Sequence, residues 1–218
     1  MNVKLKLTYK GPKTTSINFE SEWIDEEHFD VLLQDIMKTG RFNDITILDE
    51  MEREWSMKEY GKLKKKQEVE PTNAHIYFDG GYHLDSGIAG IGIVIYYNKG
   101  KDNYRYRLNA QLEQLENNNE AEYAALYYAI QNLEEIGIKS QLIKVTGDSQ
   151  GVIKQLEGEW PCYEDVLNRW LDRIEEQIKN LGLKVNYEIV SRKQNKEADK
   201  LASQAILGEI IQSHMKIN

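Results

Sequence analysis

Hydrophobic and polar side chains alternate along several short segments of the chain, and this period of two residues predicts β-strands. In the N-terminal part the alternation marks strands at residues 2–10, 14–21 and 42–50. Between and after them, apolar positions recur every three or four residues, which predicts helices at 25–38 and 57–69. The first part of the chain is therefore expected to form a small domain of ββαβα order.

A domain boundary is expected where the second of these helices ends. Pro71 follows a strongly charged stretch and is flanked by polar residues. Proline lacks a backbone N–H and ends regular structure, so this position is typical of a linker. We expect a first domain at 1–70 and a second domain at 74–212.

The second part of the chain predicts five strands and four helices in the order βββαβααβα. The strands are expected at 76–79, 89–97, 104–112, 142–148 and 184–191, and the helices at 119–136, 149–158, 164–180 and from 196 onward. The first three strands follow one another with short gaps, which favours antiparallel pairing. The later strands are separated by helices, as in parallel crossovers.

Composition limits the class of protein. The chain of 218 residues has a formal net charge of −8, and acidic residues outnumber basic ones in both expected domains. Nucleic-acid-binding proteins usually carry a basic footprint, so this balance argues against tight nonspecific binding of polyanions.

One cysteine, Cys162, excludes an internal disulfide framework and favours a reducing compartment. No apolar run could span a bilayer and the N-terminus lacks a signal-peptide core, so we expect a cytoplasmic protein without membrane association.

Four acidic residues carry the candidate chemistry: Asp79, Glu122, Asp148 and Asp199. They lie in the segments IYFDGG, NNNEAEY, TGDSQGV and NKEADKLA. Asp79 and Asp148 end strands that would be parallel neighbours, while the other two lie near the starts of helices, so the four are expected to converge at one edge of the sheet. Converging carboxylates repel one another unless a cation is bound. Oxygen ligands without accompanying His or Cys favour Mg²⁺ or Mn²⁺ over zinc.

The order and spacing of these motifs resemble the ribonuclease H type I family, within the ribonuclease H-like superfamily. The resemblance rests on YFDGG, NN-x-x-E, GDSQ and N-x-E-A-D-x-L-A, and it covers residues 74–210. The N-terminal part looks closer to that of two-domain bacterial reverse-transcriptase-like proteins. The resemblance implies an α/β fold with a five-stranded mixed sheet, its strands 1–3 antiparallel, and helices on both faces.

The same resemblance implies a metal-dependent endonuclease that hydrolyses the RNA strand of RNA–DNA hybrids and leaves 5′-phosphates. The four acids would act as catalytic metal ligands for two Mg²⁺ or Mn²⁺ ions in the substrate complex. Residues expected to contact the hybrid are Gly80, Gly81, Asn118, Asn119, Gln150 and Arg192. The short amides among them suit the 2′-hydroxyl that distinguishes RNA from DNA.

Other interpretations stay open at this point. The acidic charge and the acidic segment at 157–172 favour a noncatalytic binding or regulatory protein that retains the fold, and a nuclease of this fold with another substrate is a third possibility. Asp148-Ser149 could cap the next helix, and Asn118 and Asn119 could be simple caps. Glu120 competes with Glu122 for the second acidic position. The N-terminal domain has no assigned role, and a protein partner or self-association is as compatible with it as nucleic acid.

Overall fold

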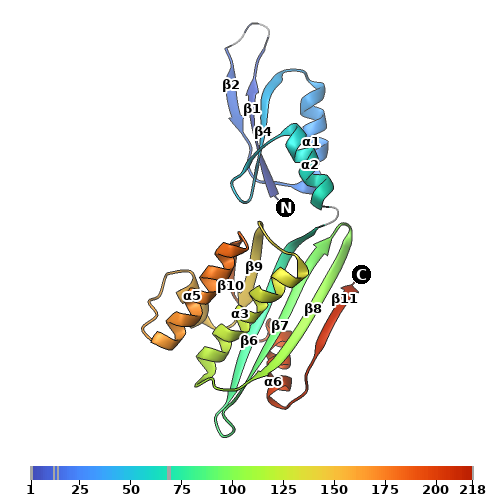
Figure 1. Cartoon of the computed structure of the whole chain (residues 1–218). Coiled ribbons are helices and arrows are strands. Elements are labelled where there is room, and N and C mark those ends of the chain that lie inside the picture. Colours follow the sequence, from blue (N-terminus) through green and yellow to red (C-terminus); the bar gives the residue numbers. More distant parts are fainter. Residues whose placement is uncertain (1, 12, 14, 68–69, 218) are drawn as a thin grey trace. The chain divides into compact units, whose positions relative to one another are not determined.

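The computed structural model of the chain describes residues 2–11, 13, 15–67 and 70–217 (Figure 1). The chain divides into two compact units, Met1–Val69 and Glu70–Asn218. Thr14, predicted to begin the second strand, and residues 68–69, predicted to end the second helix, lie outside the described residues. Among the described residues, no helix combines the length and apolarity needed to cross a membrane.

The N-terminal unit is an antiparallel sheet with two helices. Its elements are β1 (Asn2–Tyr9), β2 (Ile17–Glu20), β3 (Ile24–Asp25), α1 (Glu26–Lys38), β4 (Phe42–Asp49), β5 (Glu54–Ser56) and α2 (Met57–Gln67). The strand order is β2-β1-β4-β5, and β3 pairs with the start of β1. The expected ββαβα order thus lacks β3 and β5, which have two and three residues and are too short to show a period.

The C-terminal unit is a mixed sheet with helices on both faces, as predicted. Its elements are β6 (Pro71–His83), β7 (Ile88–Lys99), β8 (Asp102–Leu112), α3 (Asn118–Ile136), β9 (Leu142–Gly147), α4 (Gln150–Leu156), α5 (Asp165–Asn180), β10 (Lys184–Ile189), α6 (Lys196–Ile206) and β11 (Gln212–Ile217). The strand order is β10-β9-β6-β7-β8-β11. β6, β7 and β8 are antiparallel neighbours, whereas β9 runs parallel to both β6 and β10.

The sheet has six strands rather than the five expected. The additional strand, β11, pairs antiparallel with β8 and covers its outer edge. Its sequence, QSHMKI, is mostly polar and exposed, so it shows no clear hydrophobic alternation. Pairing with β8 makes it a strand, because backbone hydrogen bonds to an existing edge do not require an apolar side-chain pattern.

The two faces of the sheet are covered unequally. On one face, Ile76, Phe78 and Ile93 are fully buried in a large cluster with α3. On the other face α6 lies close against β7, because a Cβ atom at Gly90 or Gly92 would come within 2.3 Å of the helix backbone. Figure 1 shows α3 and α6 on opposite sides of the strands.

Asp79 was expected to end the first strand of this domain, and this prediction is wrong. β6 continues through Gly80 and Gly81 to His83, because its antiparallel pairing with β7 extends that far. The parallel pairing of β6 with β9 covers only His75 to Tyr77. The chain of β9 therefore leaves the sheet beside Asp79, and this gap between strands provides the expected edge.

A buried asparagine ties β8 to the C-terminal segment. The Asn109 amide donates to the carbonyl oxygens of Leu201 and Glu209, each at 2.9 Å, and accepts from the Ile211 N–H at 2.6 Å. The residue is 1% exposed. It thereby fixes the turn between α6 and β11.

We expect Asn109→Ala to lower the free energy of unfolding by about 2–3 kcal/mol, because it leaves buried backbone groups without partners. The measurement is urea unfolding followed by circular dichroism. Asn103→Ala is the matched control on the same strand, since the Asn103 side chain is exposed and bonds to the Asn98 side chain. Equal losses for both variants would show that the buried asparagine is not a structural anchor.

Candidate metal centre

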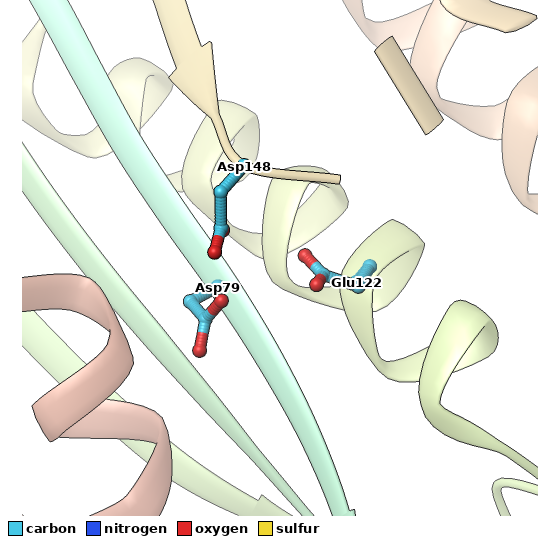
Figure 2. Close-up of side chains that lie close together, drawn as sticks. All are labelled: Asp79, Glu122 and Asp148. Atoms are coloured by element: carbon cyan, nitrogen blue, oxygen red, sulfur yellow. The ribbon is translucent and has the colours of Figure 1, made fainter. Parts of the chain in front are cut away.

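Three of the four predicted acids form a compact group. Asp79 projects from β6, Glu122 from α3, and Asp148 directly follows β9. Carboxylate oxygens of the three residues lie within 4.8 Å of one another. Figure 2 shows the three carboxyl groups extending toward a common space. Such a spacing would allow all three to contact one cation.

The register of two parallel strands brings Asp79 and Asp148 together. Tyr77 of β6 pairs with Thr146 of β9, so each aspartate lies two residues beyond the same pair. Gly147 lies between Thr146 and Asp148 in the chain. A side chain at this position would clash with the core, since a Cβ atom there would lie 2.8 Å from the Phe78 ring. The position that ends β9 is thus determined by packing inside the core.

Glu122 reaches the group because α3 lies against the backbone of β6. A Cβ atom at Gly80 would stand 2.2 Å from the Ala121 carbonyl carbon and 2.3 Å from the Glu122 nitrogen. Only glycine permits this distance. Gly80, which the resemblance implies would contact the hybrid, thus also admits α3 to the sheet, whereas a Cβ atom at Gly81 would meet only the end of the Ile206 side chain, at 3.0 Å.

The structure separates Glu122 from its neighbour Glu120. The Glu120 carboxylate accepts from the Trp170 indole N–H and from the Glu116 backbone N–H, both at 2.9 Å. It therefore joins α3 to α5 and to the preceding loop. Glu122 is 6% exposed, and its Oε2 has no hydrogen-bond partner among the described residues.

The electrostatics of the group favour a bound cation. Burial, followed by the charges of Asp148 and Asp199, raises the pKa of Asp79 from 3.8 to about 8. Burial, followed by the charge of Asp79, also raises the pKa of Glu122 well above its usual value. A buried carboxylate oxygen without a partner costs free energy, and protons or a hard cation would relieve it. The all-oxygen donor set fits Mg²⁺ or Mn²⁺.

Asp199, the fourth predicted acid, is not part of this compact group. It lies in the first turn of α6, and its Oδ1 accepts from Arg192 Nε at 2.7 Å and from Arg192 Nη2. Its charge still contributes to the raised pKa of Asp79, so it lies within electrostatic range. Arg192, expected to bind substrate, is exposed and in this structure neutralises the fourth acid.

The expected amide contacts lie beside the group and are exposed. Asn118 and Asn119 are in the first turn of α3, about one turn before Glu122, and Gln150 begins α4 just after Asp148. Neither Asn118 nor Asn119 is the helix cap. Asn117 has that role, because its side chain accepts from the Glu120 N–H at 2.9 Å. Ser149 is the N-cap residue of α4, so Asp148 is not the cap of that helix.

Sequence reasoning assigned no role to Asn195, although it is the first residue of the motif N-x-E-A-D. Its side-chain amide donates to the Phe78 carbonyl at 2.8 Å and to Asp148 Oδ1 at 2.9 Å. The residue is 1% exposed. Asn195 therefore links β6, the end of β9 and the start of α6. Its position inside the motif, immediately before a predicted helix, could have indicated a structural role for Asn195.

Comparison with known proteins places this site in a family. The family model described as "Reverse transcriptase-like" matches residues 77–205, which contain all four acids. The chain belongs to the reverse transcriptase-like family. This family lies in the ribonuclease H-like superfamily, and the solved structures similar to the chain are type I ribonucleases H. The expected resemblance to the ribonuclease H type I family and the expected mixed α/β fold of the C-terminal unit are thereby confirmed.

Two solved structures and one curated protein illustrate the similarity. The uncharacterized protein YpeP of Bacillus subtilis (strain 168) is 39% identical over 98% of this chain and 94% of its own length. RNase H1 of Halobacterium salinarum NRC-1 is 30% identical, with a TM-score of 0.55 over 63% of this chain and 99% of the enzyme. LC11-RNase H1, solved with an RNA/DNA hybrid, is 28% identical, with a TM-score of 0.55 over 62% and 98%.

The raised pKa of Asp79 predicts how the stability of this reverse transcriptase-like protein depends on pH without metal. Below pH 3.8 the carboxyl is protonated in both the folded and the unfolded chain. Between that value and about pH 8 the unfolded chain releases the proton while the folded chain retains it, so stability is lost as pH rises through this range. Melting in EDTA should therefore occur at lower temperature near pH 8 than near pH 5.

Asp79→Asn should remove much of this dependence and raise the melting temperature near pH 8 by roughly 3 °C or more. Millimolar Mn²⁺ should reduce the dependence in the wild-type protein. Asp85→Asn, an exposed aspartate outside the group, is the matched control. A melting temperature that falls on Asp79→Asn would mean that this carboxylate stabilises the fold.

Gly80→Ala should separate α3 from β6 and move Glu122 away from the two aspartates. We expect a loss of about 1–3 kcal/mol in unfolding free energy, the range typical of overpacking, together with weaker Mn²⁺ binding by calorimetry. Gly81→Ala is the control on the adjacent residue, where the flexible Ile206 side chain can move. If both variants bound Mn²⁺ equally well, the close contact would not position Glu122.

Proposed function

We propose that the protein is an endonuclease that uses divalent cations to hydrolyse the RNA strand of RNA–DNA hybrids, leaving 5′-phosphates and 3′-hydroxyls. The observation that carries the proposal is the compact group of the buried Asp79 and Glu122 with the half-buried Asp148 in a chain of this family. It is supported by similarity to LC11-RNase H1, which was solved in complex with such a hybrid.

In this proposal Asp79, Glu122 and Asp148 hold Mg²⁺ or Mn²⁺, and Asp199 completes the ligand set. Two bound ions would supply an activated water and neutralise charge on the leaving oxygen. The charges of both Asp148 and Asp199 act on Asp79, so Asp79 would hold a cation together with either neighbour. Arg192 would exchange its contact with Asp199 for one with a substrate phosphate, because its guanidinium is exposed and always charged.

Recognition of the RNA strand is assigned to the exposed amides at the starts of α3 and α4. Asn118 and Asn119 precede Glu122 on α3, Gln150 follows Asp148 along the chain, and all three are exposed. Each amide can donate to and accept from a 2′-hydroxyl. Gly81 is half-buried beside Asp79, where its backbone could approach the substrate.

One observation favours the noncatalytic alternative. The ion pair between Arg192 and Asp199 satisfies the fourth acid without a metal ion, as would suit a protein that retains the fold for binding. The net charge of −8 is also unusual for an enzyme that binds a polyanion tightly. A hybrid-cleavage assay with a calorimetric Mn²⁺ titration separates this alternative from the leading proposal.

We expect the wild-type protein to cut a labelled RNA–DNA hybrid in Mn²⁺ or Mg²⁺ and to be inactive in EDTA. Asp79→Asn and Asp148→Asn should each reduce cleavage to background while the circular dichroism spectrum stays unchanged. Asp85→Asn should cleave like the wild type. Duplex DNA and single-stranded RNA, tested in parallel, identify a nuclease with another substrate. Undiminished cleavage by Asp79→Asn, or no cleavage together with millimolar or absent Mn²⁺ binding, would exclude the proposal.

A further inference from the structure

The face of the C-terminal sheet that carries Asp79 is only partly covered by α6. Strand register places Tyr77 beside Val94 of β7, and Val94 beside Arg107 of β8. The next row contains His75, Tyr96 and Arg105, again on neighbouring strands. Side chains of a strand alternate between faces, so His75, Tyr77 and Asp79 share one face. Aromatic and basic side chains thus lead along this face to the acidic group.

A cavity of about 250 Å³ opens where this face meets the start of α6. Its lining residues are Tyr77, Val94 and Tyr96 from the sheet, and Gln194, Asn195, Glu197 and Ala198 from the helix and the residues before it. Asn195 also donates to Asp148. The cavity and the candidate metal centre therefore share a wall.

Two tyrosine rings line the cavity, and a histidine ring packs against one of them. The His75 ring lies 4.3 Å from the Tyr77 ring, centroid to centroid, at an angle of 31°. Tyr77 and Tyr96 meet edge to face at 6.0 Å. Burial and the charge of Lys144 lower the pKa of His75 to about 4, so its imidazole is neutral near pH 7. A neutral His75 ring can pack on Tyr77 without the cost of desolvating a charge, and so holds the Tyr77 ring in place at the cavity.

Polar groups beside the rings supply both acceptors and a positive charge. Glu197 accepts from the Tyr96 hydroxyl at 2.9 Å and from Arg105 Nη1 at 3.2 Å, and Arg107 Nη1 lies 3.7 Å from the same carboxylate. Among the described residues, Arg105 Nε and Arg107 Nε have no hydrogen-bond partner, nor does Asn195 Oδ1. Asn195 is 1% exposed, so its unpaired acceptor lies inside the wall of the cavity.

We propose that this face binds an unpaired nucleotide of a single-stranded nucleic acid adjoining the metal centre, its base in the cavity and its phosphate near Arg105 and Arg107. Rings suit a base, carboxylate and amide oxygens suit its exocyclic amino groups, and guanidinium groups suit phosphate. The face is continuous with the proposed active site through Asp79 and Asn195. This binding face extends the proposed function. It rests on the proposed hybrid cleavage only to explain why a single strand would be present beside the metal centre.

The test is fluorescence anisotropy of a labelled short single-stranded oligonucleotide, titrated with the full-length protein in EDTA. Tyr96→Leu removes the ring and should raise the Kd about tenfold, the effect of losing one stacked base. Tyr96→Phe retains the ring and loses only the hydroxyl bonded to Glu197, so it should bind within about twofold of the wild type. Circular dichroism melting checks that both variants are folded.

A second pair of variants tests the effect of charge at the cavity and does not disturb the core. Gln194 lines the cavity and is exposed, and Gln194→Glu preserves its shape while adding a negative charge. It should weaken binding severalfold at low salt. Gln177→Glu, on α5, makes the same change of net charge on a helix packed against α3, across the sheet, and should bind like the wild type.

Two results would overturn the inference: no wild-type binding at tens of micromolar protein, or equal binding by the wild type, Tyr96→Leu and Gln194→Glu. Its failure is distinct from that of the proposed function. Hybrid cleavage without binding of the single strand would reject this face and keep the nuclease. Binding without cleavage of the hybrid would keep the face and reject the nuclease.

Discussion

The close approach of two helices to the sheet, at positions where only glycine fits, is the constraint on which the C-terminal unit depends. α3 contacts β6 at Gly80, and α6 contacts β7 at Gly90 and Gly92. These contacts bury the core on one face and fix α6 on the other. Because Glu122 and Asp199 lie on those two helices, the same contacts also set how far each acid is from Asp79.

The acidic group that results is unfavourable for a protein without bound cations. Burial and mutual repulsion raise the pKa values of Asp79 and Glu122, so the metal-free site retains protons that ordinary carboxyls would release. Asp199 instead has its charge balanced by Arg192. In the metal-free site, protons neutralise the buried carboxylates and an ion pair neutralises Asp199. A divalent cation would replace both the protons and the ion pair. Stability is given up locally for a function that needs the charges close together.

Because α6 covers only part of one face of the C-terminal sheet, a second surface remains accessible beside the acidic group. α6 shields the sheet near Gly90 and Gly92 but leaves Tyr77 and Tyr96 lining a cavity. The overall charge of −8 does not describe this region, where Arg105 and Arg107 are gathered next to Glu197. Local arrangement, and not net charge, therefore decides where a polyanion could be held.

The sequence by itself determined the order of the helices and strands in the C-terminal unit and the acids Asp79, Glu122 and Asp148, because hydrophobic period and motif spacing are local properties. It did not determine β11, whose polar residues become a strand only by pairing with β8. The extension of β6 past Asp79 likewise depends on β7. The pairing of Asp199 with Arg192, the role of Gly80 in admitting α3, and the link from Asn195 to Asp148 all required the tertiary structure. Each is a contact between segments distant in the chain or in different elements, and its distance is set by packing that no local pattern encodes.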